Sequence, residues 1–199
     1  RNTALQSEHC KVRPLHACKE KKMDVMVLID SFKGSMTSME AGNAARDGVL
    51  RVYPHANVTV RPLADGGEGT TDALIEGLGG RKVELSVTGP MGSRVKAYYG
   101  ILADEKTAVM EMAQAAGITL VEEAQRNPGK ATTYGVGEMI RDAVSRGYRK
   151  FIIGIGGSAT NDGGIGMLRA LGVKFLTKDG EKAGEGADAL GKIHFVSLE

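Results

Sequence analysis

The sequence lacks the features of nucleic-acid-binding and membrane proteins. Its 199 residues include no tryptophan, only 5% aromatic residues and a net charge of +2. Neither a basic patch nor an RNA-binding aromatic signature therefore predicts a nucleic-acid partner. No segment approaches the ~20 consecutive apolar residues of a membrane span, and residues 1–22 have no apolar centre typical of a secretory signal. We expect a soluble, cytoplasmic protein that binds neither nucleic acid nor a membrane.

Cysteine is nearly absent. The two cysteines, Cys10 and Cys18, lie with His9 and His16 in residues 1–22. A zinc site is conceivable there, but the order of these residues lacks the paired CxxC spacing of zinc modules, and a solvated arm is the favoured alternative. Because the rest of the chain has no cysteine, no disulfide can stabilise it, which is consistent with a reducing compartment.

Glycine, in contrast, is abundant, with 28 residues, about twice its usual share. The glycines cluster in short loops between apolar runs and do not indicate collagen or low complexity. Since glycine lets a backbone approach a ligand closely, these loops are candidate ligand cradles. A protein that is merely rich in turns is the alternative.

The pattern of the first part predicts strand–helix units. Residues 23–29 are a nearly continuous apolar run, as expected for a strand covered on both faces. Thr37, with Glu40 three residues later, predicts a capping box that opens a helix. A second strand is expected at 57–64, and a second helix at 70–78.

The middle of the chain has a different pattern. Apolar residues alternate with polar ones over 83–87 and 95–101, and a further strand is expected at 107–112. This predicts an antiparallel meander with one half-solvated face. The strand–helix pattern returns from residue 132, and the FIIGI run at 151–155 predicts a buried strand. The chain is thus predicted to be α/β, with a parallel sheet and a second, smaller α/β unit that contains the meander.

Three loops that follow predicted strands are candidate ligand sites, because ligands of open α/β sheets bind at the carboxyl ends of strands. Free N–H groups and the positive end of the following helix favour anions there. In the first loop, Ser31, Lys33 and Ser35 can surround a carboxylate or phosphate, and Gly34 removes a steric obstacle. A simple turn with a solvated lysine is the alternative.

The second loop carries Asp65 and Glu68, separated by Gly66 and Gly67. Two carboxylates in this spacing can hold Mg²⁺, which prefers oxygen ligands and keeps several waters. A glycine turn with solvated acids and Thr70 as a helix cap explains the same residues.

The third loop, 154–164, begins like the dinucleotide fingerprint GxGxxA, the basis for an NAD-dependent dehydrogenase as an alternative. That fingerprint requires a helix to begin within the motif, whereas residues 161–164 favour a turn. The polar residues of the loop suit phosphate and metal better. A second motif, 186–193, lacks the Ser or Thr that a P-loop needs at residue 193, so any use of ATP would not involve a P-loop.

The three loops and their flanking segments, in this order along the chain, resemble those of the class I, bacterial-type glycerate kinases. The resemblance implies transfer of the γ-phosphoryl group of ATP, with Mg²⁺, to D-glycerate, usually giving 2-phosphoglycerate. It also implies a flavodoxin-like parallel sheet, a second domain inserted into it, and an active site between the two. The matching segments are DSFKGSMTSMEA (30–41), PLADGGEGT (62–70), VTGPMGSRVKAYYG (87–100), MEMAQAAGITLV (110–121), RNPGKATTYGVGEMI (126–140) and FIIGIGGSATNDGGIGM (151–167).

With the resemblance, roles can be assigned to the loop residues. We assign catalytic roles to Lys33, Asp65 and Asp162, and Mg²⁺ contacts to Asp65 and Glu68. Substrate or phosphate contacts are assigned to Ser31, Gly34, Ser35, Gly66, Gly67, Gly156, Gly157, Ser158, Thr160 and Asn161.

The sequence departs from the family pattern in two ways. Residues 1–22 have no counterpart, and Leu28-Ile29 replaces the usual Ala-Pro. Family chains are also nearly twice as long, so we expect residues 23–80 to be the first part of the flavodoxin-like domain and 81–199 an incomplete second domain. Asp162 is then one candidate for the catalytic base and a residue beyond 199 the other. A non-catalytic anion-binding fragment is an alternative, and a homo-oligomer is conceivable.

Overall fold

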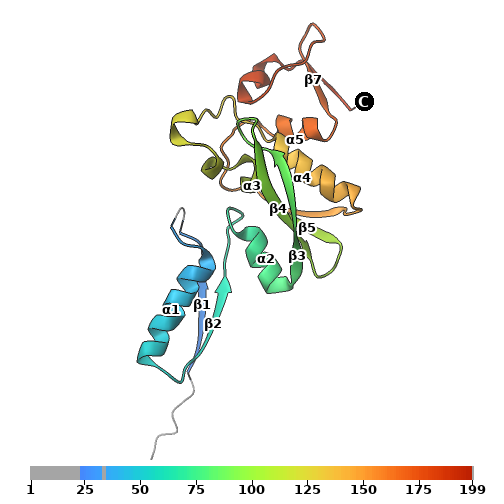
Figure 1. Cartoon of the computed structure of the whole chain (residues 1–199). Coiled ribbons are helices and arrows are strands. Elements are labelled where there is room, and N and C mark those ends of the chain that lie inside the picture. Colours follow the sequence, from blue (N-terminus) through green and yellow to red (C-terminus); the bar gives the residue numbers. More distant parts are fainter. Residues whose placement is uncertain (1–22, 33–34, 199) are drawn as a thin grey trace, which may run out of the picture.

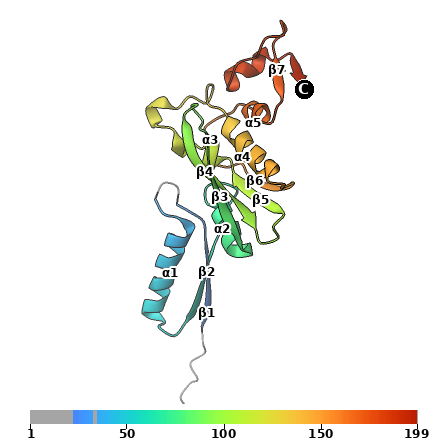
Figure 2. The ribbon, with the colours of Figure 1, turned by 45° about the vertical axis from the view of Figure 1, so that its right-hand side comes forward.

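A computed structural model describes residues 23–32 and 35–198 of the chain. Figures 1 and 2 show a small unit at the amino-terminal end, a larger sheet with its helices in the middle, and a small carboxy-terminal unit. Lys33, Gly34 and residues 1–22 lie outside the described residues. The roles predicted for Lys33 and Gly34, the zinc alternative and the solvated arm therefore stay predictions.

The amino-terminal unit is a β–α–β unit. Strands β1 (Asp24–Ile29) and β2 (Asn57–Pro62) pair in parallel, and helix α1 (Ser38–Val52) connects them. The predicted capping box is confirmed, since the Thr37 N–H donates to Glu40 Oε2 over 2.8 Å and the Glu40 N–H donates to Thr37 Oγ1 over 3.2 Å.

The prediction that the first strand is covered on both faces is wrong. Alternate residues of β1 are half-buried, but Met26 is 65% exposed and Leu28 52% exposed. Helix α1 packs on one face of a sheet of only two strands, and among the described residues nothing covers the other face. The continuous apolar run at 23–29 therefore does not indicate a strand that is buried on both faces.

The four-stranded sheet contains the predicted meander. Its order is β3 (Gly80–Thr88), β4 (Arg94–Leu102), β5 (Thr107–Glu111) and β6 (Lys150–Gly154). The first three strands pair antiparallel, and β6 adds in parallel to β5. An α/β fold with a parallel sheet and a separate unit containing antiparallel strands is thus confirmed.

Helices cover both faces of this sheet. Alternate residues of β4, Ala97, Tyr99 and Ile101, join a buried core with helices α3 (Ala113–Ala116) and α4 (Tyr134–Ser145). Helix α2 (Thr70–Leu78) packs on the opposite face, where a Cβ at Gly100 would lie 2.8 Å from Ile75 Cδ1. Helix α2 therefore links the amino-terminal unit to the larger sheet, and the domain boundary at residue 80 stays a prediction.

The prediction of a buried strand at 151–155 is wrong. Ile152 is 42% exposed, Ile153 36% and Ile155 76%. Strand β6 lies at the edge of the sheet, so an apolar run marks a strand that is only partly covered.

The remainder of the chain consists of short elements. Two 3-10 helices, η1 (Ile118–Leu120) and η2 (Glu123–Gln125), precede α4, and α5 (Ile165–Ala170) follows β6. Strands β7 (Lys174–Leu176) and β8 (Phe195–Ser197) pair antiparallel around η3 (Ala187–Lys192). Within the described ranges, no helix is both long and apolar enough to cross a membrane.

Candidate active site

Two of the predicted loops lie directly against each other. The Gly156 N–H donates to the Gly66 carbonyl over 2.9 Å, and a Cβ at Gly156 would lie 2.7 Å from Gly67 Cα. A Cβ at Gly154 would lie 2.5 Å from the Gly66 carbonyl oxygen. These glycines, predicted as ligand cradles, are thus required for the contact between the loops, which we call the loop junction. It joins the carboxyl ends of β2 and β6.

Glu111 binds the second loop where that loop enters helix α2. It is the last residue of β5, its side chain is fully buried, and it accepts hydrogen bonds from the N–H groups of Thr71 (2.6 Å) and Gly69 (3.2 Å). Burial raises the pKa of the Glu111 carboxyl, and the two amide hydrogen bonds offset part of that effect. The carboxylate therefore occupies the start of α2. Sequence reasoning missed Glu111, although an acid ending the apolar strand at 107–111 was a signal.

Asp162 is likewise a buried acid that accepts hydrogen bonds at helix starts, here those of α4 and α5. It is 1% exposed and accepts hydrogen bonds from the N–H groups of Thr133 (2.9 Å), Gly164 (2.9 Å) and Gly166 (3.2 Å). The Thr133 hydroxyl donates to it as well. These contacts anchor the start of α4 to the start of α5. They account for the buried acid without a catalytic role, which stays a prediction.

The helix starts expected to bind external anions thus already have carboxylates of the chain. Glu40 lies at the start of α1, Glu111 at that of α2 and Asp162 at that of α5. A helix N-terminus attracts negative charge, and here the chain supplies it. An anionic ligand would need other donors.

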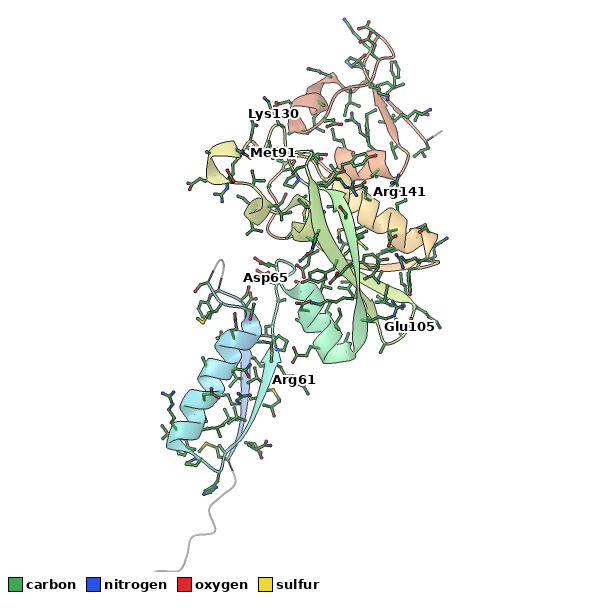
Figure 3. The ribbon with its side chains drawn as sticks, in the orientation of Figure 1. Arg61, Asp65, Met91, Glu105, Lys130 and Arg141 are labelled. Atoms are coloured by element: carbon green, nitrogen blue, oxygen red, sulfur yellow. The ribbon has the colours of Figure 1, made fainter. Side chains whose placement is uncertain are left out.

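Asp65 and Glu68, in contrast, are exposed. One oxygen of Asp65 accepts from the Gly67 N–H over 3.0 Å, which fixes the turn. Figure 3 shows Asp65 at the tip of the loop between the amino-terminal unit and the four-stranded sheet. Glu68 lines a cavity of about 400 Å³ between the starts of α1 and α2, together with the predicted Ser31 and Ser35. Further carboxylates, Glu40, Asp72 and Glu76, make this acidic pocket negative among its described residues.

The hydroxyls of the third loop hold its own backbone. The Ser158 hydroxyl donates to the Thr160 carbonyl over 2.8 Å, and the Thr160 hydroxyl donates to the Ala131 carbonyl over 2.6 Å. Gly157 has a positive φ of 74°, and its carbonyl accepts from the Ile118 N–H. The phosphate contacts predicted for Ser158 and Thr160 would have to share these hydroxyls, whereas Asn161 is exposed.

Asn161 lines a second cavity, of about 220 Å³, which also contains Arg126 and Asn127. Sequence reasoning gave Arg126 no role, although it opens one of the segments that resemble the family. The loop 154–164 does not open a helix as the dinucleotide fingerprint requires, because α5 begins only at Ile165.

Comparison with known proteins identifies the family. Residues 25–199 match the glycerate kinase family. A glycerate kinase of Halalkalibacterium halodurans is 46% identical over 174 residues, covering 87% of this chain and 46% of the relative. The glycerate 2-kinase of Escherichia coli is 42% identical over 176 residues, covering 88% of this chain and 46% of the relative.

A solved structure agrees with the sequence comparisons. A Salmonella typhimurium LT2 protein assigned as glycerate kinase 2 superposes with a TM-score of 0.74 at 43% identity, covering 89% of this chain and 48% of that one. The chain thus spans about half the length of the curated relatives it matches. The order of the loop motifs along the chain, the fold and the sequence comparisons agree. The chain therefore belongs to the glycerate kinase family.

Proposed function

We propose that the protein carrying this chain transfers the γ-phosphoryl group of ATP to D-glycerate, with 2-phosphoglycerate as the favoured product. Membership of the family supports this proposal. The observation that carries it is the loop junction, where the Gly156 N–H donates to the Gly66 carbonyl. The junction fixes the exposed Asp65–Glu68 turn beside the carboxyl ends of β5 and β6, the edge where ligands of α/β sheets bind.

Phosphoryl transfer depends mainly on positioning and charge neutralisation. Bound Mg²⁺ would neutralise charge that develops on the phosphate oxygens. Among the described residues, no three His, Cys, Asp or Glu side chains form a metal-binding group. The exposed Asp65 and Glu68 fit Mg²⁺ nevertheless, because this ion is commonly held by one or two carboxylates together with nucleotide phosphates.

A coupled assay of ADP release, with and without D-glycerate, tests the proposal. It should use a protein of the relatives' full length that contains this chain, and phosphorus NMR would distinguish 2- from 3-phosphoglycerate. We expect ADP release to require D-glycerate and Mg²⁺. Full-length protein that releases no ADP with D-glycerate would refute the kinase proposal and favour a non-catalytic anion-binding role.

A further inference from the structure

The cavity beside Arg126 differs from the acidic pocket in the chemistry of its walls. It lies between segment 126–131 and residues 158–161 of the third loop, near Met91 and Lys130, which Figure 3 labels. Within the described part of the chain, no residue that lines it is acidic. Its remaining walls are largely apolar and include Met91, Ile118, Val121, Pro128, Ala131 and Ala159.

The polar side chains of this cavity offer hydrogen-bond donors. The Arg126 Nε donates to the Val121 carbonyl over 3.3 Å, and no ion pair among the described residues involves Arg126. Asn127 Oδ1 accepts from the Gly129 N–H over 3.1 Å, which leaves the Asn127 amide nitrogen as a donor. Asn161 is exposed at the same cavity. A guanidinium with two amides and no carboxylate is suited to an oxyanion.

One wall of the cavity is formed by the same loop that makes the loop junction. Gly156 donates to Gly66, and Ser158, two residues further along the same loop, already lines the cavity. Two trans peptides span at most about 7–8 Å between Cα atoms. The Ser158 wall of the cavity is therefore close to the junction.

The size of the cavity favours a small acid over a nucleotide. Its volume of about 220 Å³ is below the roughly 300–1,000 Å³ typical of pockets for larger ligands. A three-carbon acid fits this space, whereas a nucleoside triphosphate would extend far outside it. The planar guanidinium also matches a carboxylate, which it can bind through two parallel hydrogen bonds.

We propose that this cavity is the carboxylate subsite of the acceptor acid, with Arg126 as its charged contact and the amides of Asn127 and Asn161 as neutral donors. The proposal rests on the proposed function, since it takes D-glycerate as the acceptor. The carboxylate bound at Arg126 leaves the hydroxyl end of the acid free to extend toward the loop junction.

Steady-state kinetics of Arg126→Ala and Arg126→Lys in the full-length protein test the subsite. We expect Arg126→Ala to raise the KM for D-glycerate at least tenfold while the KM for ATP changes less than twofold. Arg126→Lys should recover part of the loss, because an ammonium keeps the charge but not the paired hydrogen bonds. Lys130→Ala is the matched control, since Lys130 is exposed on the same segment and does not line the cavity.

The results that would overturn the subsite are distinct. A raised KM for ATP alone would instead make the cavity a nucleotide phosphate site. Equal effects of Arg126→Ala and Lys130→Ala would reduce Arg126 to a general charge effect. Unchanged kinetics in Arg126→Ala would leave the cavity without a role in acceptor binding.

Calorimetric titration without turnover separates this proposal from that of the kinase. D-glycerate and D-lactate should bind to the wild type, and Arg126→Ala should lower their affinity. Glycerol should not bind, and inorganic phosphate should bind more weakly than D-glycerate. Arg126-dependent binding of the acids without ADP release would retain the subsite and refute the kinase. ADP release with an unchanged D-glycerate KM in Arg126→Ala would do the reverse. Preferential binding of inorganic phosphate would overturn the carboxylate subsite.

Discussion

Glu111 and Asp162 belong to the same group of loops as Asp65 and Glu68, yet the first two are buried and the last two exposed. The buried pair accepts hydrogen bonds from backbone amides at helix starts. The exposed pair lies on one turn, where Asp65 accepts a hydrogen bond from the Gly67 N–H of the turn itself. Acids of one loop cluster thus divide into those that hold the loops and those that are free to contact a ligand.

This division has a consequence for charge. The buried carboxylates satisfy amides that a phosphate could otherwise bind, so the positive ends of these helices do not serve an external anion. The neutralising charge for an anionic substrate must then come from bound Mg²⁺ or from side chains, and Arg126 is a candidate among the described side chains. Among the described residues, the charged side chains of the two cavities accordingly differ in sign, with carboxylates lining one and Arg126 the other.

The largest expected effect on stability is that of Asp162→Ala. It would leave the buried N–H groups of Thr133 and Gly166, and the half-buried one of Gly164, without their acceptor. At about 1–3 kcal/mol for each buried unsatisfied group, the free energy of unfolding should fall by at least about 2 kcal/mol. Urea denaturation measures the loss. Asp179→Ala, at an exposed turn, should cost less than about 0.5 kcal/mol, and equal costs would contradict the anchor role.

Gly156→Ala should have the next largest effect. Its Cβ would lie 2.7 Å from Gly67 Cα, so the loops must separate, at a cost of about 1–3 kcal/mol. A Cβ at Gly191 meets nothing within 4 Å, which makes Gly191→Ala the matched control. Thermal unfolding should show a drop for the first variant only. A full-length Gly156→Ala protein with normal turnover would show that the loop junction is not required for activity.

Glu111→Gln should change how stability depends on pH. Because burial raises the pKa of Glu111, the folded protein retains a proton that the unfolded chain releases. The stability from this proton is fully present below the ordinary glutamate pKa, about 4.3, and is lost as the pH rises through the raised value.

Denaturation of the wild type and Glu111→Gln from pH 4 to 8 measures this effect. The advantage of the wild type over the variant should decline as the pH rises, since glutamine has no proton to lose. Glu123→Gln, at an exposed position, should show no such trend. A constant difference across the range would mean that burial does not shift the titration of Glu111.

The parts of this arrangement that sequence could predict are local. The capping box of Thr37 and Glu40 spans three residues, and the structure has both of its hydrogen bonds. The Glu111–Thr71 contact joins residues 40 positions apart, and no local pattern reports such a partner. The exposed Met26 and Ile152 show a related limit, because an apolar run describes the strand and not what covers it.

The smallest effect on stability, and the largest contrast between stability and activity, is expected for Asp65→Asn and Glu68→Gln. Both side chains are exposed, so each substitution should change the free energy of unfolding by less than about 0.5 kcal/mol. Asparagine can still accept from the Gly67 N–H and keep the turn, but it loses the charge that would contact Mg²⁺.

In the full-length protein, kcat/KM should fall at least about 10²-fold for Asp65→Asn, equivalent to roughly 2.7 kcal/mol of transition-state stabilisation. Part of that loss should be recovered at higher Mg²⁺ concentration, which a purely structural defect would not allow. Glu105→Gln, an exposed acid at the opposite end of the sheet that Figure 3 labels, should leave turnover unchanged. Asp65→Asn with wild-type kcat/KM and Mg²⁺ dependence would place Asp65 among the acids that only shape the loops, and the division between buried and exposed carboxylates would no longer separate structure from chemistry.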